Sequence, residues 1–140
     1  MKTEDVSPTQ YQALSEFRYQ IRKFLCFSEN AARSAGLEPQ QHQLLLAVRG
    51  FAGEGDGPTI GYLAERLQLR HHSTVELIDR MEKRKMVHRR VSEQDRRRVM
   101  IGLTKTAENL LKNLSTQHIT EIRQMGPGLV AALQHVLAEL

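Results

Sequence analysis

The sequence predicts a mainly α-helical fold with one small β-hairpin. Apolar residues recur at three-to-four spacing over most of the 140 residues, and only residues 87–103 show the alternation that is typical of strands. Hydrophobic residues make up 40% of the chain and charged residues 26%, which are ordinary proportions for a globular protein. The length suits one compact domain, so we expect a single domain over residues 1–140.

The first predicted helix covers residues 7–34. Ser7 can cap this helix, Pro8 suits its first position, and Gln10 completes a capping box with Ser7. Apolar side chains then follow on one stripe, and Gly36 ends the pattern.

A second helix is predicted over 39–49, where a proline again stands at the first helical position. The glycine-rich stretch 50–58 is a loop. Thr59 can then cap a short helix over 60–67, whose apolar residues lie on one face.

The next helix follows a brief turn over 68–70 and carries apolar residues at helical spacing. Its start is open between two positions. Ser73 forms a possible capping box with Glu76, but a start nearer His71 fits the apolar stripe equally well.

The pattern then changes to period two. Residues 87–91 and 99–103 alternate as two strands, and the charged stretch 92–98 joins them. Thr104 can cap a long final helix, which we expect to break at Gly126-Pro127-Gly128 and to be followed by a last, separate helix.

Positive charge is concentrated in one stretch of the chain. The net charge is +4, but residues 80–98 carry nine Lys or Arg against three acidic residues, so this stretch is +6 and the remainder −2. Such a band suits phosphate binding, because each contacted phosphate releases condensed counterions. A solvated charged face would have the same composition, so the elements that carry the charge must decide between the two.

The elements around this band predict a winged helix-turn-helix. A short helix, a tight turn and a second amphipathic helix are followed directly by the basic hairpin. An α-helix fits the major groove of DNA, and an arginine-bearing hairpin tip can reach the minor groove. We therefore expect double-stranded DNA as a partner, with Arg70, His71, His72, Ser73, Glu76, Arg80, Arg89, Arg90, Arg96, Arg97 and Arg98 as candidate contacts.

Several motifs occur in one order. Asp95–Thr104 reads Asp-x-Arg, five residues, Leu-Thr, and upstream of it lie Leu37–Leu46, Leu63–Leu67 and Val75–Glu82. In these motifs the chain resembles the multiple-antibiotic-resistance regulators, the MarR family of bacterial and archaeal transcription factors, from about residue 10 to its end. The resemblance implies a DNA-binding lobe over about 37–104 and dimerisation helices over about 7–35 and 104–140.

The function that the resemblance implies is that of a transcriptional regulator, not an enzyme, without a cofactor. We expect a ligand-responsive homodimeric repressor, with a small aromatic or phenolic molecule as effector. The apolar stripes of the terminal helices also favour a homodimer, and two-fold symmetry predicts a pseudo-palindromic operator. The alternative is an effector-independent architectural or antitoxin-like DNA-binding module. Such a module would bind DNA without sequence selectivity, and no ligand would weaken its binding.

The chain departs from the family's pattern at three places, one of which is Lys105-Thr106-Ala107, where the family often has a glycine soon after Leu-Thr. The family often has glycine where Lys85 ends the second helix of the helix-turn-helix, so this helix must end on a strained lysine or run directly into the strand. Glu76 stands where a basic or neutral residue is common, and an acid there lowers phosphate affinity unless it accepts a bond from cytosine or orients an arginine.

In the wing, Arg97 occupies the arginine of the Asp-x-Arg pattern and is the first choice for the minor groove, with Arg96 second. Asp95 is expected to orient Arg97, because phosphate would repel its carboxylate. Arg89, Arg90 and Arg98 are expected either to contact phosphates or to be solvated residues of the hairpin, and the pattern leaves both open.

Other chemistry has little support in the sequence. The six histidines lack metal-ligand spacing, and we expect His118 to be a paired histidine at an interface. Cys26 is the one cysteine; its apolar neighbours favour a buried structural role over redox sensing. With one cysteine, no signal segment and no long apolar run, we expect a cytoplasmic protein with no membrane contact.

Overall fold

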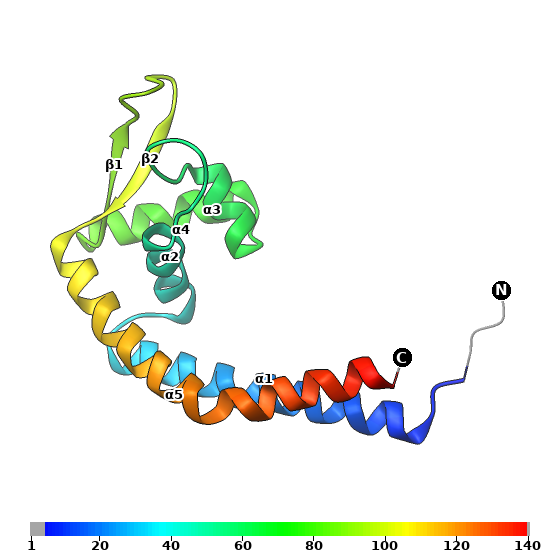
Figure 1. Cartoon of the computed structure of the whole chain (residues 1–140). Helices are drawn as coiled ribbons and strands as arrows, with labels where there is room; N and C mark the ends of the chain where they lie inside the picture. Colours follow the sequence, from blue (N-terminus) through cyan, green and yellow to red (C-terminus); the bar gives the residue numbers. More distant parts are fainter. Residues whose placement is uncertain (1–4, 140) are drawn as a thin grey trace. The chain divides into compact units, whose positions relative to one another are not determined.

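The computed structural model describes residues 5–139, which form five helices and one two-stranded antiparallel hairpin (Figure 1). The predicted fold class is confirmed. In chain order the elements are α1 (Pro8–Ser34), α2 (Pro39–Arg49), α3 (Ile60–Leu67), α4 (His71–Lys83), β1 (Val87–Val91), β2 (Val99–Leu103) and α5 (Lys105–Ala138).

The chain divides into two compact units. Ala32–Ser115 forms one of them, the winged unit. The other, the two-helix unit, combines α1 up to Ala31 with α5 from Thr116 onward.

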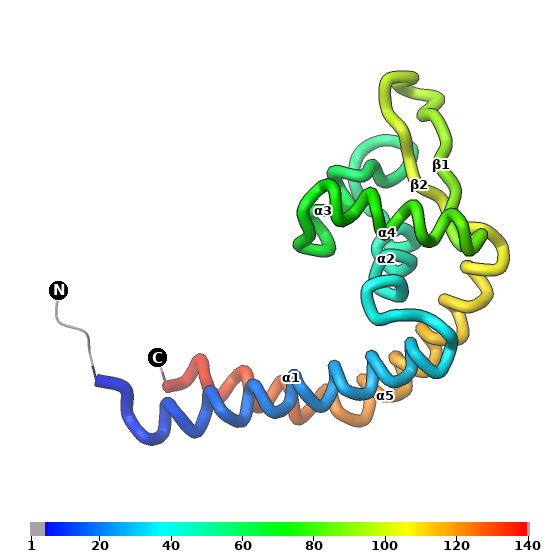
Figure 2. The backbone as a smooth tube through the Cα atoms, turned by 180° about the vertical axis from the view of Figure 1, so that it is seen from behind, coloured from blue at the N-terminus to red at the C-terminus, as the bar shows by residue number. Residues whose placement is uncertain are grey.

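The core of the winged unit lies among α2, α3, α4 and the base of the hairpin. Every one of these elements contributes fully buried apolar side chains, among them Leu44, Leu45, Leu63, Ile78, Met81, Val87, Met100 and Ile101. The hairpin register runs from Val87 opposite Leu103 to Val91 opposite Val99. The tip of the hairpin extends beyond the helices of this unit (Figures 1 and 2).

The predicted caps form hydrogen bonds in the structure. Gln10 N donates to Ser7 Oγ at 3.1 Å and Ser7 N donates to Gln10 Oε1 at 2.9 Å, which is a complete capping box. Thr59 Oγ1 accepts from Tyr62 N at 3.2 Å, so α3 begins where the sequence predicted. At the start of α5, Thr104 Oγ1 accepts from Ala107 N at 3.2 Å.

The two ends of α4 settle questions that the sequence left open. The helix begins at His71, and Ser73 is not its cap. After its other end Lys85 adopts φ +59°, a left-handed conformation that favours glycine. The chain therefore leaves α4 through a strained lysine, one of the two alternatives that the missing glycine implied.

The predicted break at residues 126–128 is wrong, because α5 continues through Pro127 as one helix. A proline inside a helix removes one hydrogen bond and costs about 3 kcal/mol. We attribute the continuity to packing against α1, which α5 contacts before Pro127 through His118 and after it beside Gly128. A Cβ at Gly128 would lie 3.2 Å from Gln20 Oε1, and Ala132, one turn further on, is buried.

In the two-helix unit, α1 and the C-terminal part of α5 lie side by side and antiparallel (Figures 1 and 2). Gln10 Nε2 donates to Glu139 O at 2.9 Å near one end of the pair, and Ser28 contacts His118 near the other. Within residues 5–139, no helix is long and apolar enough to cross a membrane.

His118 is paired within its own chain. Its Nε2 lies 2.8 Å from Ser28 Oγ, and the rings of Phe24 and Phe27 contact the imidazole edge-on with centroids 6.2 and 5.4 Å away. The expectation of a paired histidine is confirmed, and the partner Ser28 lies on α1.

The expected burial of Cys26 is wrong, because the side chain is exposed. The buried face of α1 carries Ser28, and a residue two positions away points about 200° around the helix. The apolar residues next to Cys26 in the sequence therefore did not predict which face of the helix carries its thiol. Asn30 Nδ2 lies 3.6 Å from its sulfur, and a redox role stays a prediction.

Candidate nucleic-acid interface

One face of α4 does not pack into the core, and the exposed side chains at its start are one arginine and two histidines. Thr74, Leu77, Ile78 and Met81 are the buried residues of this helix. Arg70, His71 and His72 are exposed at its start, and Ser73 is half-buried. Further along the helix Glu76 and Arg80 are also exposed. The first turn can therefore meet a base edge or a phosphate without disturbing the core.

Arg89 neutralises two acids of α4. Its Nη2 donates to Asp79 Oδ1 at 2.6 Å, and its Nη1 donates to Glu82 Oε1 at 2.7 Å. The hydrogen bond to Asp79 is the main cause that raises the pKa of the guanidinium. This geometry directs Arg89 toward α4, and its role as a DNA contact stays a prediction. The pairing reduces the negative charge beside the recognition face, which we define as the exposed residues His71, His72, Glu76 and Arg80 of α4.

The wing loop, residues 92–98, is closed by its own main chain. Ser92 N donates to Arg98 O at 2.9 Å, and Arg98 N donates to Asp95 O at 3.0 Å. Inside this turn Asp95 N donates to Ser92 Oγ at 3.1 Å. The loop is therefore held in one shape while the side chains of Arg96, Arg97 and Arg98 stay exposed.

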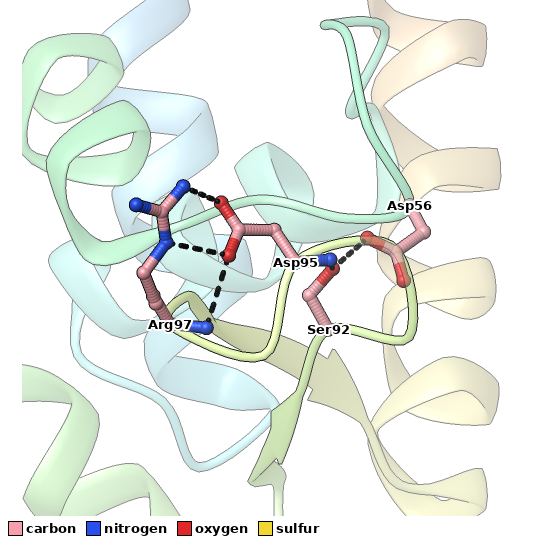
Figure 3. A network of polar contacts seen from close by, with 4 residues as sticks. All are labelled: Asp56, Ser92, Asp95 and Arg97. Atoms are coloured by element: carbon pink, nitrogen blue, oxygen red, sulfur yellow. Dashed lines mark hydrogen bonds and ion pairs between the residues drawn. The ribbon is translucent and has the colours of Figure 1, made fainter.

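The carboxylate of Asp95 holds Arg97 in a defined direction (Figure 3). Asp95 Oδ1 accepts from Arg97 N at 3.1 Å and Nε at 3.0 Å, and Oδ2 accepts from Nη2 at 3.2 Å. The bond from the Arg97 side chain is the main reason that the pKa of Asp95 lies below its usual range. The Arg97 side chain remains 90% exposed, so it is oriented without being covered.

Arg90 contacts the loop between α2 and α3. Its Nη2 donates to the main-chain oxygen of Asp56, in the loop between α2 and α3, at 2.8 Å. The Asp56 carboxylate in turn accepts from Ser92 Oγ at 2.7 Å and from Glu93 N at 3.1 Å. Sequence reasoning missed Asp56 and Ser92, because nothing periodic links residues 36 positions apart. The loop places two acids, Glu54 and Asp56, each between glycines, and nothing in the sequence distinguishes one from the other.

The winged unit also has a hollow of about 480 Å³ beside the end of α2 and the start of α5. Arg49, Lys105 and Lys112 line it together with Glu108 and the apolar Leu46 and Leu111. Such a lining suits a molecule with an apolar body and a negative group.

Over residues 5–139, no three His, Cys, Asp or Glu side chains lie close enough together to form a metal site.

Residues 35–98 match the model of the MarR family. This segment contains the helix-turn-helix, β1 and the whole wing loop, and it ends directly before β2. No curated protein matches the sequence.

Solved structures of MarR regulators have the same fold. AbsC, a MarR family transcriptional regulator from Streptomyces coelicolor, is 22% identical with a TM-score of 0.73, over 88% of this chain and 82% of AbsC. A mutant of MepR from S. aureus, bound to an oligodeoxyribonucleotide, is 21% identical with a TM-score of 0.64, over 96% and 98% of the two chains. CouR from Rhodococcus jostii, bound to p-coumaroyl-CoA, is 22% identical with a TM-score of 0.63, over 73% and 69%.

Proposed function

We propose that this chain, which belongs to the MarR family through residues 35–98, is a homodimeric, ligand-responsive repressor of transcription. It binds a pseudo-palindromic operator in double-stranded DNA and carries out no catalysis. The observation that carries the proposal is the exposed, oriented Arg97 at the tip of a winged helix-turn-helix.

The first turn of α4 reads the major groove. Arg70, His71 and His72 are exposed donors at the start of the helix, where recognition helices contact base edges. Ser73 and Glu76 follow on the same helix, and the Glu76 carboxylate can accept from the amino group of cytosine. Arg80 lies about one turn beyond Glu76, where a long cationic side chain suits a phosphate.

The wing reads the adjacent minor groove. Arg97 inserts its guanidinium, because the negative potential of a narrow A·T-rich groove favours this group. Arg96 and Arg98 flank it as phosphate contacts. Support comes from the MepR mutant, which is bound to an oligodeoxyribonucleotide and has the same fold over nearly the whole chain.

The second copy of the chain covers the two-helix unit. This unit leaves large apolar side chains exposed, a pattern that marks an interface. They are Tyr11, Leu14, Tyr19, Leu25, Ile119, Ile122, Val130, Leu133 and Leu137. Pairing two copies about a two-fold axis buries such a face and allows two winged units to bind one DNA duplex.

The effector is a small aromatic or phenolic molecule that weakens operator binding. The hollow lined by Arg49, Lys105 and Leu46 suits the carboxylate and the ring of such a compound. CouR, which has the same fold, is bound to p-coumaroyl-CoA. A ligand releases DNA only if it binds the DNA-free form more tightly than the DNA-bound form.

Footprinting on the DNA upstream of the chain's own gene tests this function. We expect protection of two half-sites about one helical turn apart, and loss of protection when a phenolic acid is added. Arg97→Ala should protect the same DNA only at higher protein concentration. Protection without sequence selectivity would favour the effector-independent architectural module instead. Protection that stays the same when a phenolic acid is added would favour it as well.

A further inference from the structure

One acid of the loop between α2 and α3 contacts the base of the wing. Asp56 Oδ1 accepts from Ser92 Oγ at 2.7 Å (Figure 3). Asp56 Oδ2 accepts from Glu93 N at 3.1 Å. The main-chain oxygen of the same residue accepts from Arg90 Nη2 at 2.8 Å. Asp56 therefore joins the last residues of β1 and the first residues of the wing loop to a different part of the winged unit.

The Asp56 carboxylate also decides how the Ser92 hydroxyl is used. An ionised carboxylate can only accept, so the single hydrogen of Ser92 Oγ must point to Asp56. The lone pairs of that oxygen are then directed to the N–H of Asp95, which lies 3.1 Å away. Ser92 is only 2% exposed, so water does not replace either partner readily.

The loop that carries Asp56 is itself held against the hairpin. Thr59 forms an isolated bridge with Met100 of β2, and Ile101 N donates to Pro58 O at 3.0 Å. Gly57 permits the approach, since a Cβ there would lie 3.1 Å from Met100 Sδ and 3.4 Å from Arg90 Nη2. The loop is thus a fixed support from which Asp56 reaches the wing.

We infer that Asp56 is a positioning residue for DNA binding: through Ser92 it places Asp95, and through Asp95 it directs Arg97 into the minor groove. The inference rests on the proposed function of the wing. It assigns a role to an acid that lies outside the helix-turn-helix and outside the wing loop.

Simple electrostatics predicts the opposite effect of removing Asp56. A negative charge beside DNA opposes phosphate, so its loss should strengthen binding. Positioning predicts weaker binding, because an Arg97 released from its direction must be ordered again on the DNA. The sign of the change therefore separates the two effects.

Asp56→Ala is the first variant, and Glu54→Ala is its matched control. Glu54 is an exposed acid in the same loop, so both variants remove one negative charge. We expect Asp56→Ala to weaken operator binding about two- to tenfold, the cost of ordering one long side chain. Glu54→Ala should leave affinity unchanged or slightly higher. Equal or tighter binding by Asp56→Ala would overturn the inference.

A double-mutant cycle with Arg97→Ala excludes a general loss of structure. If Asp56 acts through Arg97, Asp56→Ala should cause no further loss in the Arg97→Ala protein. The same fold-loss in both backgrounds would mean a structural role only. Ser92→Ala leaves Asp56 in place but removes the hydroxyl, and it should reproduce the result if Asp56→Ala proves too unstable.

Amide hydrogen exchange in the DNA-free protein separates this inference from the proposed function. The N–H of Arg97, which bonds Asp95 Oδ1 and does not touch Asp56, should exchange faster in Asp56→Ala but not in Glu54→Ala. Unchanged exchange at Arg97 would refute the positioning role whatever the DNA result. Faster exchange in a protein that binds no operator would instead leave the positioning of Arg97 standing and refute the proposed function.

Discussion

Asp95 and Arg97 form a pair in which the acid is largely covered and the base stays in solvent. The side chain of Asp95 is 33% exposed and that of Arg97 is 90% exposed, although three bonds of 3.0 to 3.2 Å join them. Ion pairs at a surface stabilise a fold by little. We therefore attribute to this pair the direction of a guanidinium rather than the stability of the hairpin.

Arg97→Ala should weaken operator binding by about 1–3 kcal/mol, with the larger loss where the minor groove is A·T-rich. Asp95→Ala should also weaken binding, although it removes a negative charge. Fluorescence anisotropy with an operator duplex measures both. Tighter binding by Asp95→Ala, in a protein whose circular dichroism is unchanged, would contradict an oriented wing.

The pKa values of Asp56 and Asp95 report the wing contacts as a function of pH. Hydrogen bonds from Ser92 and Arg97, respectively, are the main causes that lower them below the ordinary aspartate value. A carboxyl group whose pKa is lowered by folding stabilises the folded state fully at pH values above its unfolded pKa of about 3.9. This stabilisation is lost as the pH falls through the folded pKa. The wing should therefore keep its contacts at neutral pH and lose them only in strong acid.

Carbon-13 titration of the two carboxyl groups by NMR measures this directly. Arg97→Ala should raise the pKa of Asp95 toward its ordinary value and leave that of Asp56 in place. Ser92→Ala should raise the pKa of Asp56. Titration of both groups at ordinary values in the unaltered protein would mean that these bonds do not form in solution.

Arg89→Ala should both destabilise the winged unit and weaken DNA binding. Loss of two short ion pairs by a guanidinium that is 28% exposed should cost about 1 kcal/mol of unfolding free energy. It also leaves Asp79 and Glu82 unneutralised beside the recognition face, so affinity should fall for all DNA sequences alike. Adding Asp79→Asn and Glu82→Gln to the variant should restore affinity. Urea unfolding and anisotropy with two unrelated duplexes measure the effects.

The continuity of α5 can be tested with two glycines. A Cβ at Gly126 would meet Ile122 Cγ2 at 3.7 Å, an ordinary contact, so Gly126→Ala should stabilise the protein by about 1 kcal/mol. Gly128→Ala should gain less, because its Cβ would lie 3.2 Å from Gln20 Oε1. Thermal unfolding ranks the two variants. A break at this point would instead make Gly126→Ala neutral or destabilising.

The dimer proposal predicts a different effect for two exposed positions on one helix. Ile122 is 46% exposed, and Ile122→Glu should shift the protein toward a single-chain species in sedimentation at micromolar concentration. Gln124→Glu adds the same charge at an exposed polar position two residues away and should leave the dimer intact. A single-chain species in the unaltered protein would rule out the homodimer.

Local signals predicted most of the fold correctly. The Ser7–Gln10 box and the Thr59 cap mark helix starts because their hydrogen bonds join residues three positions apart. The Asp-x-Arg pattern likewise predicted the contact between Asp95 and Arg97, which are two residues apart. Patterns of this kind are readable because the partners lie within one turn of the chain.

Tertiary packing decided the features that the sequence predicted wrongly or missed. Pro127 remains helical because α5 packs on α1 before and after it, and a rule about proline alone does not contain that energy. Cys26 is exposed because the burial of α1 follows the face that meets α5. Asp56 reaches Ser92 over 36 positions only because the loop before α3 docks on β2. Hydrogen bonds between near neighbours in the chain leave a pattern in the sequence, whereas contacts created by docking one element on another arise only when the core is assembled.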